Sequence, residues 1–272
     1  MSTAETTAPN LTQARSQLLL DGWCVVPDAL SAAEADLILE RLWVAADEYR
    51  RRGRETHVRG LDPNAANVRV FELLDLDPVF RELIRAPLAL GLVEALLGPD
   101  FLISNFTANI ARPGSRSMSL HSDQALVVPE PWLAPWSINI IWCLTDVRAE
   151  NGATLFIPES HRVTRLAELG TDPASRLRPF EARKGAVIAW DGRVWHTSGA
   201  NVTANEERAL LFGYYSRAFL RTQANWNAVL SAETQAGLDP EFRRLRGLDP
   251  TANIALAAGL LASDLGGHRR AD

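Results

Sequence analysis

The chain has 272 residues, 47% of them hydrophobic and 22% charged, which is typical of a globular protein able to bury a substantial core. Its net charge of −5 argues against nucleic acid or an anionic membrane as a partner, because both usually require a basic face. The N-terminal run lacks a basic and an apolar region, and no apolar stretch reaches the ~20 residues that span a bilayer. We therefore expect a cytoplasmic protein.

The first elements read as a tail, a helix end and a strand. Residues 1–14 are expected to be flexible, and the run 17–27 predicts a helix end, a turn at Asp21-Gly22 and a short buried strand. Cys24 and Cys143 are the only cysteines, and both lie among apolar residues. They are predicted to be buried free thiols rather than a disulfide.

Two helical regions follow. Ser31 with Glu34 three residues later forms a capping-box pattern, which predicts a helix from there to about Arg51. A second helical region is predicted over about 76–98, where Gly98 and a proline close it.

From about residue 101 the pattern changes to short apolar runs separated by Pro, Gly, Asn and Asp, which predicts strands. Helices followed by many short strands favour a mainly β protein with flanking helices around a double-stranded β-helix, a jelly-roll and cupin-like core. The predicted strands cover 101–110, 136–145, 153–158, 186–190 and 209–219.

The absence of a repeat or a linker in the sequence favours one domain over residues 1–272. Within it, residues 15–100 are expected to form a helical support, 101–220 the jelly-roll core and 221–272 a C-terminal helical segment. That last segment, whose clearest apolar face is 254–261, is expected either to close the active site or to pair with a second subunit as a homodimer.

Three side chains suggest a metal site. His121 and Asp123 are two apart, so on a strand both would point to one face, and His196 follows a predicted strand and a turn. Two histidines and one carboxylate form the ligand set that holds non-heme Fe(II) and leaves other positions open. Arg208, twelve residues after His196, is placed to anchor a cosubstrate carboxylate. The remaining histidines, His57, His161 and His268, lie in less suitable surroundings.

Several runs resemble the phytanoyl-CoA dioxygenase-like branch of the Fe(II)/2-oxoglutarate-dependent oxygenases. The resemblance covers about residues 15–220. Glu159 replaces a glycine that is usual in the family, which affects a turn and not a ligand. The similar runs are GWCVVP (22–27), LHSDQ (120–124), the segment 139–161, and WHTSGAN (195–201) with Arg208.

This resemblance implies 2-oxoglutarate and O2 as cosubstrates at Fe(II). Arg208 is the matching position for the far carboxylate of 2-oxoglutarate, which a guanidinium holds through parallel hydrogen bonds, and Ser198 would add a donor. Alternatively, Arg208 is a surface residue beside two glutamates, and Arg217, of opposite strand parity, is the fallback anchor.

Further cosubstrate contacts are implied at polar residues within apolar runs. By resemblance Asn109 and Asn139 can face the cosubstrate, and Thr154 is a weaker candidate. Polar groups are costly to bury without partners, so their alternative role is hydrogen bonding within strands or turns.

The reaction expected from the resemblance is hydroxylation of an unactivated C–H bond, with 2-oxoglutarate converted to succinate and CO2. Asp123 disfavours halogenation, because related halogenases carry a small residue there. Desaturation, epoxidation and rearrangement use the same iron centre. The alternatives are a jelly-roll metalloenzyme of other chemistry, such as an isomerase or a 2-oxoglutarate-independent oxygenase, and a catalytically silent sensor or interaction protein.

The substrate is expected to be a small, free, partly apolar metabolite, as in natural-product biosynthesis, because no basic cluster suits the phosphates of coenzyme A. Five of the eight tryptophans lie between 132 and 195, and the proline-rich loop 127–136 follows the metal pair. Its rings are expected to form a wall or lid, or to pack the core. The pocket candidates are Met118, Gln124, Trp132, Trp136, Tyr214 and Trp226.

Overall fold

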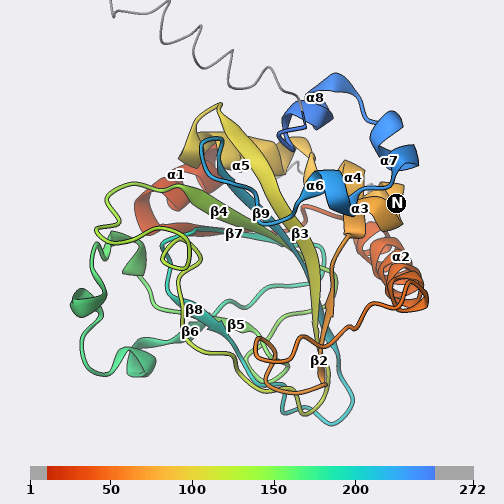
Figure 1. Cartoon of the computed structure of the whole chain (residues 1–272). Helices are drawn as coiled ribbons and strands as arrows, with labels where there is room; N and C mark the ends of the chain where they lie inside the picture. Colours follow the sequence, from red (N-terminus) through yellow and green to blue (C-terminus); the bar gives the residue numbers. More distant parts are fainter. Residues whose placement is uncertain (1–10, 249–272) are drawn as a thin grey trace, which may run out of the picture.

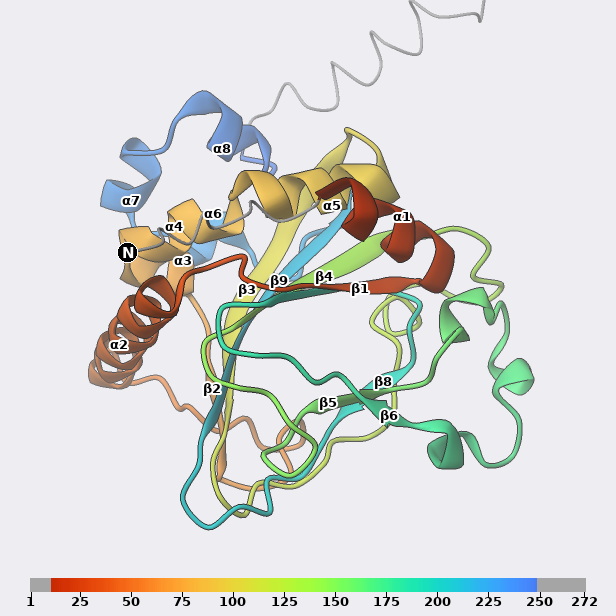
Figure 2. The ribbon, with the colours of Figure 1, turned by 180° about the vertical axis from the view of Figure 1, so that it is seen from behind.

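The computed structural model describes residues 11–248 and places two antiparallel sheets face to face, with helices covering the outer face of the larger one (Figures 1 and 2). In spatial order, the six-stranded sheet contains β1 (Trp23–Val26), β7 (Val187–Asp191), β4 (Ser137–Cys143), β9 (Arg208–Arg217), β3 (Phe101–Ala111) and β2 (Asn67–Val70), and the three-stranded sheet contains β6 (Arg178–Pro179), β5 (Thr154–Phe156) and β8 (His196–Ser198).

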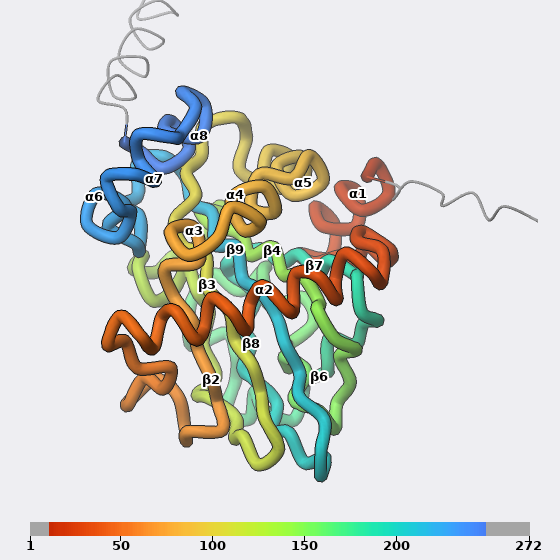
Figure 3. The backbone as a smooth tube through the Cα atoms, turned by 90° about the vertical axis from the view of Figure 1, so that its right-hand side faces the viewer, coloured from red at the N-terminus to blue at the C-terminus, as the bar shows by residue number. Residues whose placement is uncertain are grey.

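The helices support the larger sheet from outside. The long helix α2 (Ala32–Arg51) crosses the strands of this sheet, and the short helices α3 (Leu73–Leu76) and α4 (Pro78–Ile84) lie beside it (Figure 3). None of the helices between residues 11 and 248 is long and apolar enough to span a bilayer. The α-helices are α1 (Leu11–Asp21), α2 (Ala32–Arg51), α3 (Leu73–Leu76), α4 (Pro78–Ile84), α5 (Pro87–Leu97), α6 (Trp226–Val229), α7 (Ala232–Ala236) and α8 (Pro240–Arg244), with 3-10 turns at Ser160–Arg162, Leu166–Leu169 and Pro173–Arg176.

The period-two alternation of β9 separates the two faces of the sheet. Ala209, Leu211 and Tyr215 pack against the helices in the main hydrophobic core. Leu210 points the other way, into the smaller core between the sheets, and Phe212 packs against that core. The expected jelly-roll architecture is therefore the observed one, and its interior is the inner face of the larger sheet.

The capping box at Ser31 is confirmed, with the Ser31 side chain accepting from the Glu34 backbone and the Glu34 carboxylate accepting from Ser31. Both cysteines are buried free thiols, as expected. Burial raises the pKa of Cys24 and of Cys143 to about 12, so neither is a reactive thiolate.

One helical prediction is confirmed in outline and another needs correction. The region 76–98 is helical and ends at Gly98 as predicted, but it contains two helices, because the prolines that begin α4 and α5 cannot donate to a preceding turn. Helix α1 begins at Leu11, inside the expected tail 1–14. Ala14 and Leu18 are buried there, and Arg15 Nε donates to the Gly91 carbonyl at 3.0 Å, which anchors α1 against α5.

The prediction missed the strands β2, β6 and β8. They have two to four residues each, too few for a period-two pattern to stand out. The expected helical segment after 221 contains α6, α7 and α8, whereas its predicted apolar face at 254–261 lies outside the described residues.

Candidate metal centre and cavity

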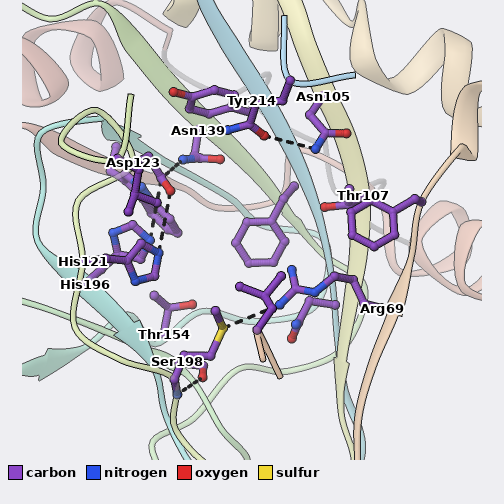
Figure 4. A pocket seen from close by; sticks show the side chains of 18 of the residues that line it. Arg69, Asn105, Thr107, His121, Asp123, Asn139, Thr154, His196, Ser198 and Tyr214 are labelled. Carbon is purple, nitrogen blue, oxygen red and sulfur yellow. Dashed lines mark hydrogen bonds and ion pairs between the residues drawn. The ribbon is translucent and has the colours of Figure 1, made fainter. Parts of the chain in front are cut away.

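His121, Asp123 and His196 meet at one side of a cavity on the inner face of the larger sheet (Figure 4). One ligand atom from each lies within 4.8 Å of the others. The Nε2 atoms of His121 and His196 are each 3.7 Å from a different oxygen of the Asp123 carboxylate. The two ring centroids are 4.5 Å apart. This arrangement can place three donor atoms around one ion.

The backbone of the pair is not the strand that the sequence suggested. His121 forms only an isolated bridge with His196, each amide donating to the other's carbonyl at 3.0 and 2.8 Å. The chain then turns, because Ser122 Oγ donates to the Gly192 carbonyl and accepts from the Ala125 amide. The turn, rather than strand alternation, brings Asp123 back toward the two rings.

Hydrogen bonds at Nδ1 orient both imidazoles. His121 Nδ1 lies 2.8 Å from the Ser119 carbonyl and His196 Nδ1 lies 2.9 Å from the Val194 carbonyl. A carbonyl oxygen only accepts, so each neutral ring carries its proton on Nδ1 and keeps its lone pair on Nε2. Burial lowers the pKa of His196, which favours the same neutral form. This is the state in which histidine binds a metal.

Asp123 is held by a partner on the sheet. Asn139 Nδ2 donates to Asp123 Oδ2. In the register of the sheet, Asn139 pairs with Trp190 on β7 and with Tyr214 on β9. The pKa of Tyr214 is raised mainly by burial and secondly by the negative charge of the Asp123 carboxylate, so Tyr214 stays protonated.

The cavity has a volume of about 270 Å³. Its lining contains the three candidate ligands and seven other residues singled out in the sequence. The latter are Asn109, Met118, Asn139, Thr154, Ser198, Arg208 and Tyr214.

Arg208 is a buried cation, not a surface residue beside glutamates. It is 1% exposed, and its bonds go to neutral acceptors: Nε donates to the Gly152 carbonyl, and Nη1 to the backbone and side-chain oxygens of Asn109, all at 3.0 Å. No carboxylate of residues 11–248 forms a salt bridge with it. Burial lowers its pKa to about 10, so the guanidinium is still charged at neutral pH. A buried charge needs a counter-charge, and the described residues provide none for this guanidinium, which lines the cavity.

Ser198 and Thr154 come from adjacent strands, β8 and β5, and are directly paired. Ser198 Oγ accepts from the Met118 amide at 3.0 Å, which leaves its own hydrogen available to a ligand. Arg217 is not a lining residue. It has the strand parity of Tyr215, whose side chain packs on the helix side of β9.

Four predicted pocket residues are absent from the cavity lining, which corrects the sequence prediction. Gln124 is buried in the turn, bonded to the Ala134 carbonyl and the Trp136 amide. Trp132 belongs to a separate apolar cluster, and Trp136 packs against this cluster. Trp226 lies in the main core with its indole donating to the Ile103 carbonyl.

Part of the cavity lining was not predicted from the sequence. Arg69 lines the cavity from strand β2, where it lies between two buried valines. It was missed because this strand was not recognised in the sequence. Asn105 and Thr107 share the parity of Asn109 on β3, and Phe212 shares that of Tyr214 on β9, so strand alternation would have identified them.

The profile of the phytanoyl-CoA dioxygenase (PhyH) family matches residues 18–209. The protein "Dioxygenase af480" of Aspergillus fumigatus is 48% identical over 239 residues, which cover 88% of this chain and 77% of that protein. The residues compared thus include the complete candidate metal centre.

Two solved structures share the fold. The non-heme α-ketoglutarate-dependent carbocyclase SnoK from nogalamycin biosynthesis has a TM-score of 0.65 at 20% identity, covering 88% of this chain and 94% of that chain. The epimerase SnoN in complex with Fe3+, α-ketoglutarate and nogalamycin RO has a TM-score of 0.59 at 19% identity, covering 85% and 92%.

Proposed function

Because this chain belongs to the phytanoyl-CoA dioxygenase family, we propose that it is an Fe(II)- and 2-oxoglutarate-dependent oxygenase that hydroxylates a C–H bond of a small, partly apolar metabolite. The observation that carries the proposal is one cavity lined both by His121, Asp123 and His196 and by Arg208, a buried guanidinium without a carboxylate partner among the described residues. A metal ion would satisfy the three candidate ligands, and a dianion that also reaches Arg208 would supply the missing counter-charge.

The metal would be held by His121 Nε2, His196 Nε2 and the Asp123 carboxylate. Two neutral nitrogens and one carboxylate form the donor set that suits non-heme Fe(II) and leaves positions open for further ligands. Asn139 would fix the orientation of the Asp123 carboxylate through its hydrogen bond, as outer residues commonly do at metal sites. The presence of Asp123 also supports hydroxylation over halogenation.

Arg208 would bind the far carboxylate of 2-oxoglutarate. Asn109 and Gly152 hold the guanidinium in place, so little side-chain freedom is lost when the anion binds. Ser198, whose hydroxyl hydrogen is free to donate, would add a bond to the same ligand, and Thr154 lies beside it.

When bound, Fe(II), 2-oxoglutarate and O2 supply the oxidant, with 2-oxoglutarate converted to succinate and CO2 and the substrate C–H converted to C–OH. Tyr214, kept protonated by burial, would donate a hydrogen bond at the cavity wall. Phe212 and Phe71 line the same cavity and would limit the access of water to the reacting atoms.

The test is aerobic turnover of the purified protein with Fe(II), 2-oxoglutarate and a panel of small metabolites, followed by succinate quantification and product mass. A hydroxylase adds one oxygen atom, and this atom comes from labelled O2. A product that loses two hydrogens, or an isomer of the substrate such as the name of the epimerase SnoN suggests for that protein, would contradict hydroxylation but retain the oxygenase class. If the protein bound iron but formed no succinate, either with any metabolite of the panel or with 2-oxoglutarate alone, the result would contradict the oxygenase class itself.

A further inference from the structure

This inference depends on the function proposed above. We propose that the substrate is electrically neutral, and that Asn105, Thr107 and Gln223 form an uncharged subsite that binds a hydrogen-bond acceptor oxygen of it. Asp62 keeps this part of the cavity neutral by pairing with Arg69.

The three polar residues lie away from the metal side of the cavity. Asn105 and Thr107 are on β3, across the cavity from His121 and Asp123 (Figure 4). Gln223 follows β9, and its backbone N–H donates to the side-chain oxygen Ser104 Oγ on β3 at 2.9 Å. All three line the cavity.

The amide groups are already oriented as donors. Asn105 Nδ2 donates to Gln223 Oε1 at 3.2 Å, while Asn105 Oδ1 accepts from the Phe106 amide at 2.9 Å. Each side-chain oxygen thus already accepts one hydrogen bond, and no described residue accepts from Gln223 Nε2, which is left as a donor for a ligand. A carbonyl, ether or hydroxyl oxygen on the substrate is the complementary group.

Arg69 lines the cavity but is neutralised within the protein. Its Nη2 donates to Asp62 Oδ1 at 2.7 Å and its Nε to the same oxygen at 3.2 Å. The Asp62 side chain is fully buried, and the Val58 amide also donates to it. The pair carries no net charge, so Arg69 does not require an anionic substrate.

The remaining charges cancel once the proposed ligands are bound. Fe(II) and Arg208 bring three positive charges, while Asp123 and the two carboxylates of 2-oxoglutarate bring three negative ones. A substrate carboxylate or ammonium would then be buried without a counter-charge, which is costly. A neutral molecule avoids that cost.

The rest of the wall suits an apolar skeleton. Phe71 and Phe212 lie inside the cavity, and Leu61 and Leu126, 43% and 69% exposed, line it nearer to solvent. A substrate that covers these two leucines would remove apolar surface from water, which favours binding.

The experiment compares three molecules with one skeleton and different charge: 1-adamantanol, 1-adamantanecarboxylate and 1-adamantylammonium. Each is titrated calorimetrically into the full-length protein loaded with Zn(II), as a redox-inert substitute, and 2-oxoglutarate. We expect the alcohol to bind at least about tenfold more tightly than either ion. Tighter binding of either ion, or no binding of the alcohol to protein that binds 2-oxoglutarate, would overturn the proposal. Failure to bind 2-oxoglutarate would instead contradict the proposed function.

Two variants separate the subsite from general packing. Asp62→Asn leaves Arg69 without its counter-charge, so the preference should shift about tenfold or more toward the carboxylate, an effect that a merely structural role would not produce. Gln223→Leu, at an exposed position, should weaken the binding of the alcohol about threefold or more relative to the binding of both ions. An unchanged ranking of the three molecules in both variants would overturn the assignment of these residues.

Discussion

Nη1 of Arg208 lies 3.0 Å from both the backbone oxygen and the side-chain oxygen of Asn109. These bonds orient the guanidinium but do not neutralise it, because amide oxygens carry no formal charge. The protein therefore holds a charged group in a fixed direction in the wall of the cavity that the candidate metal ligands also line, which is the arrangement that an anionic cosubstrate requires.

Replacing Arg208 by Gln should weaken 2-oxoglutarate binding by about 2 to 5 kcal/mol, roughly thirtyfold to several thousandfold, because a buried charge-assisted contact is lost. The measurement is calorimetric titration of 2-oxoglutarate into the Zn(II)-loaded variant. Arg217→Gln, whose residue is not part of the cavity lining, is the matched control and should bind like the wild type. Equal affinities for both variants would remove Arg208 from the role of anchor.

Asn139→Leu should weaken metal affinity roughly 10- to 100-fold, since Asp123 would lose the hydrogen bond that orients its carboxylate. Competition with a metal chelator measures this affinity. Asn105→Leu provides the control. Tyr214 pairs with Asn139 on one side and with Asn105 on the other, so Asn105 lies one strand further from Asp123 and forms no hydrogen bond with it. We expect this variant to keep the metal affinity of the wild type. Comparable losses in both would indicate a general packing defect.

Gly22→Ala should destabilise the protein more than Gly53→Ala does. Both glycines have positive φ, +78° and +76°, which costs about 1–2 kcal/mol for a residue with a side chain. At Gly22 the added carbon would lie 2.3 Å from His161 Cγ, whereas nothing lies within 4 Å at Gly53. The clash should add roughly 1–3 kcal/mol. Chemical denaturation of the two variants tests this difference, and equal losses would contradict it.

Stability should fall at acidic pH, in part through His161. Burial lowers the pKa of His161 below its ordinary value near 6.5, so the unfolded chain takes up a proton more readily than the folded one. Its contribution is thus complete above pH 6.5 and is lost as the pH falls from there to the folded-state pKa. In His161→Gln the unfolding free energy should fall less between pH 7 and 5, by at most about 1.4 kcal/mol per pH unit. Parallel profiles for variant and wild type would contradict this.

The sequence predicted what depends on local pattern or on residue type. The capping box at Ser31, the long strands such as β3 and β9, and the residue types of the metal set were all readable from it. The jelly-roll class followed from the order of these elements together with the family resemblance.

The rest depends on contacts between distant segments. Asp123 reaches the two histidines through a turn bonded to Gly192, and Arg69 enters the cavity from a four-residue strand. Trp132 and Trp226 are of a residue type that often lines pockets, but their indole nitrogens donate to backbone carbonyls inside apolar clusters. Periodicity carries no information on such long-range pairings.

The most direct test of the proposed centre is anaerobic titration of the metal-free protein with Fe(II) and 2-oxoglutarate, followed by visible absorption. We expect the weak charge-transfer band of an iron–2-oxoacid chelate, its loss in Asp123→Ala, and its retention in Arg208→Gln only at much higher 2-oxoglutarate concentration. Tight Fe(II) binding without the band, at saturating 2-oxoglutarate, would show that this cavity does not bind 2-oxoglutarate at the metal.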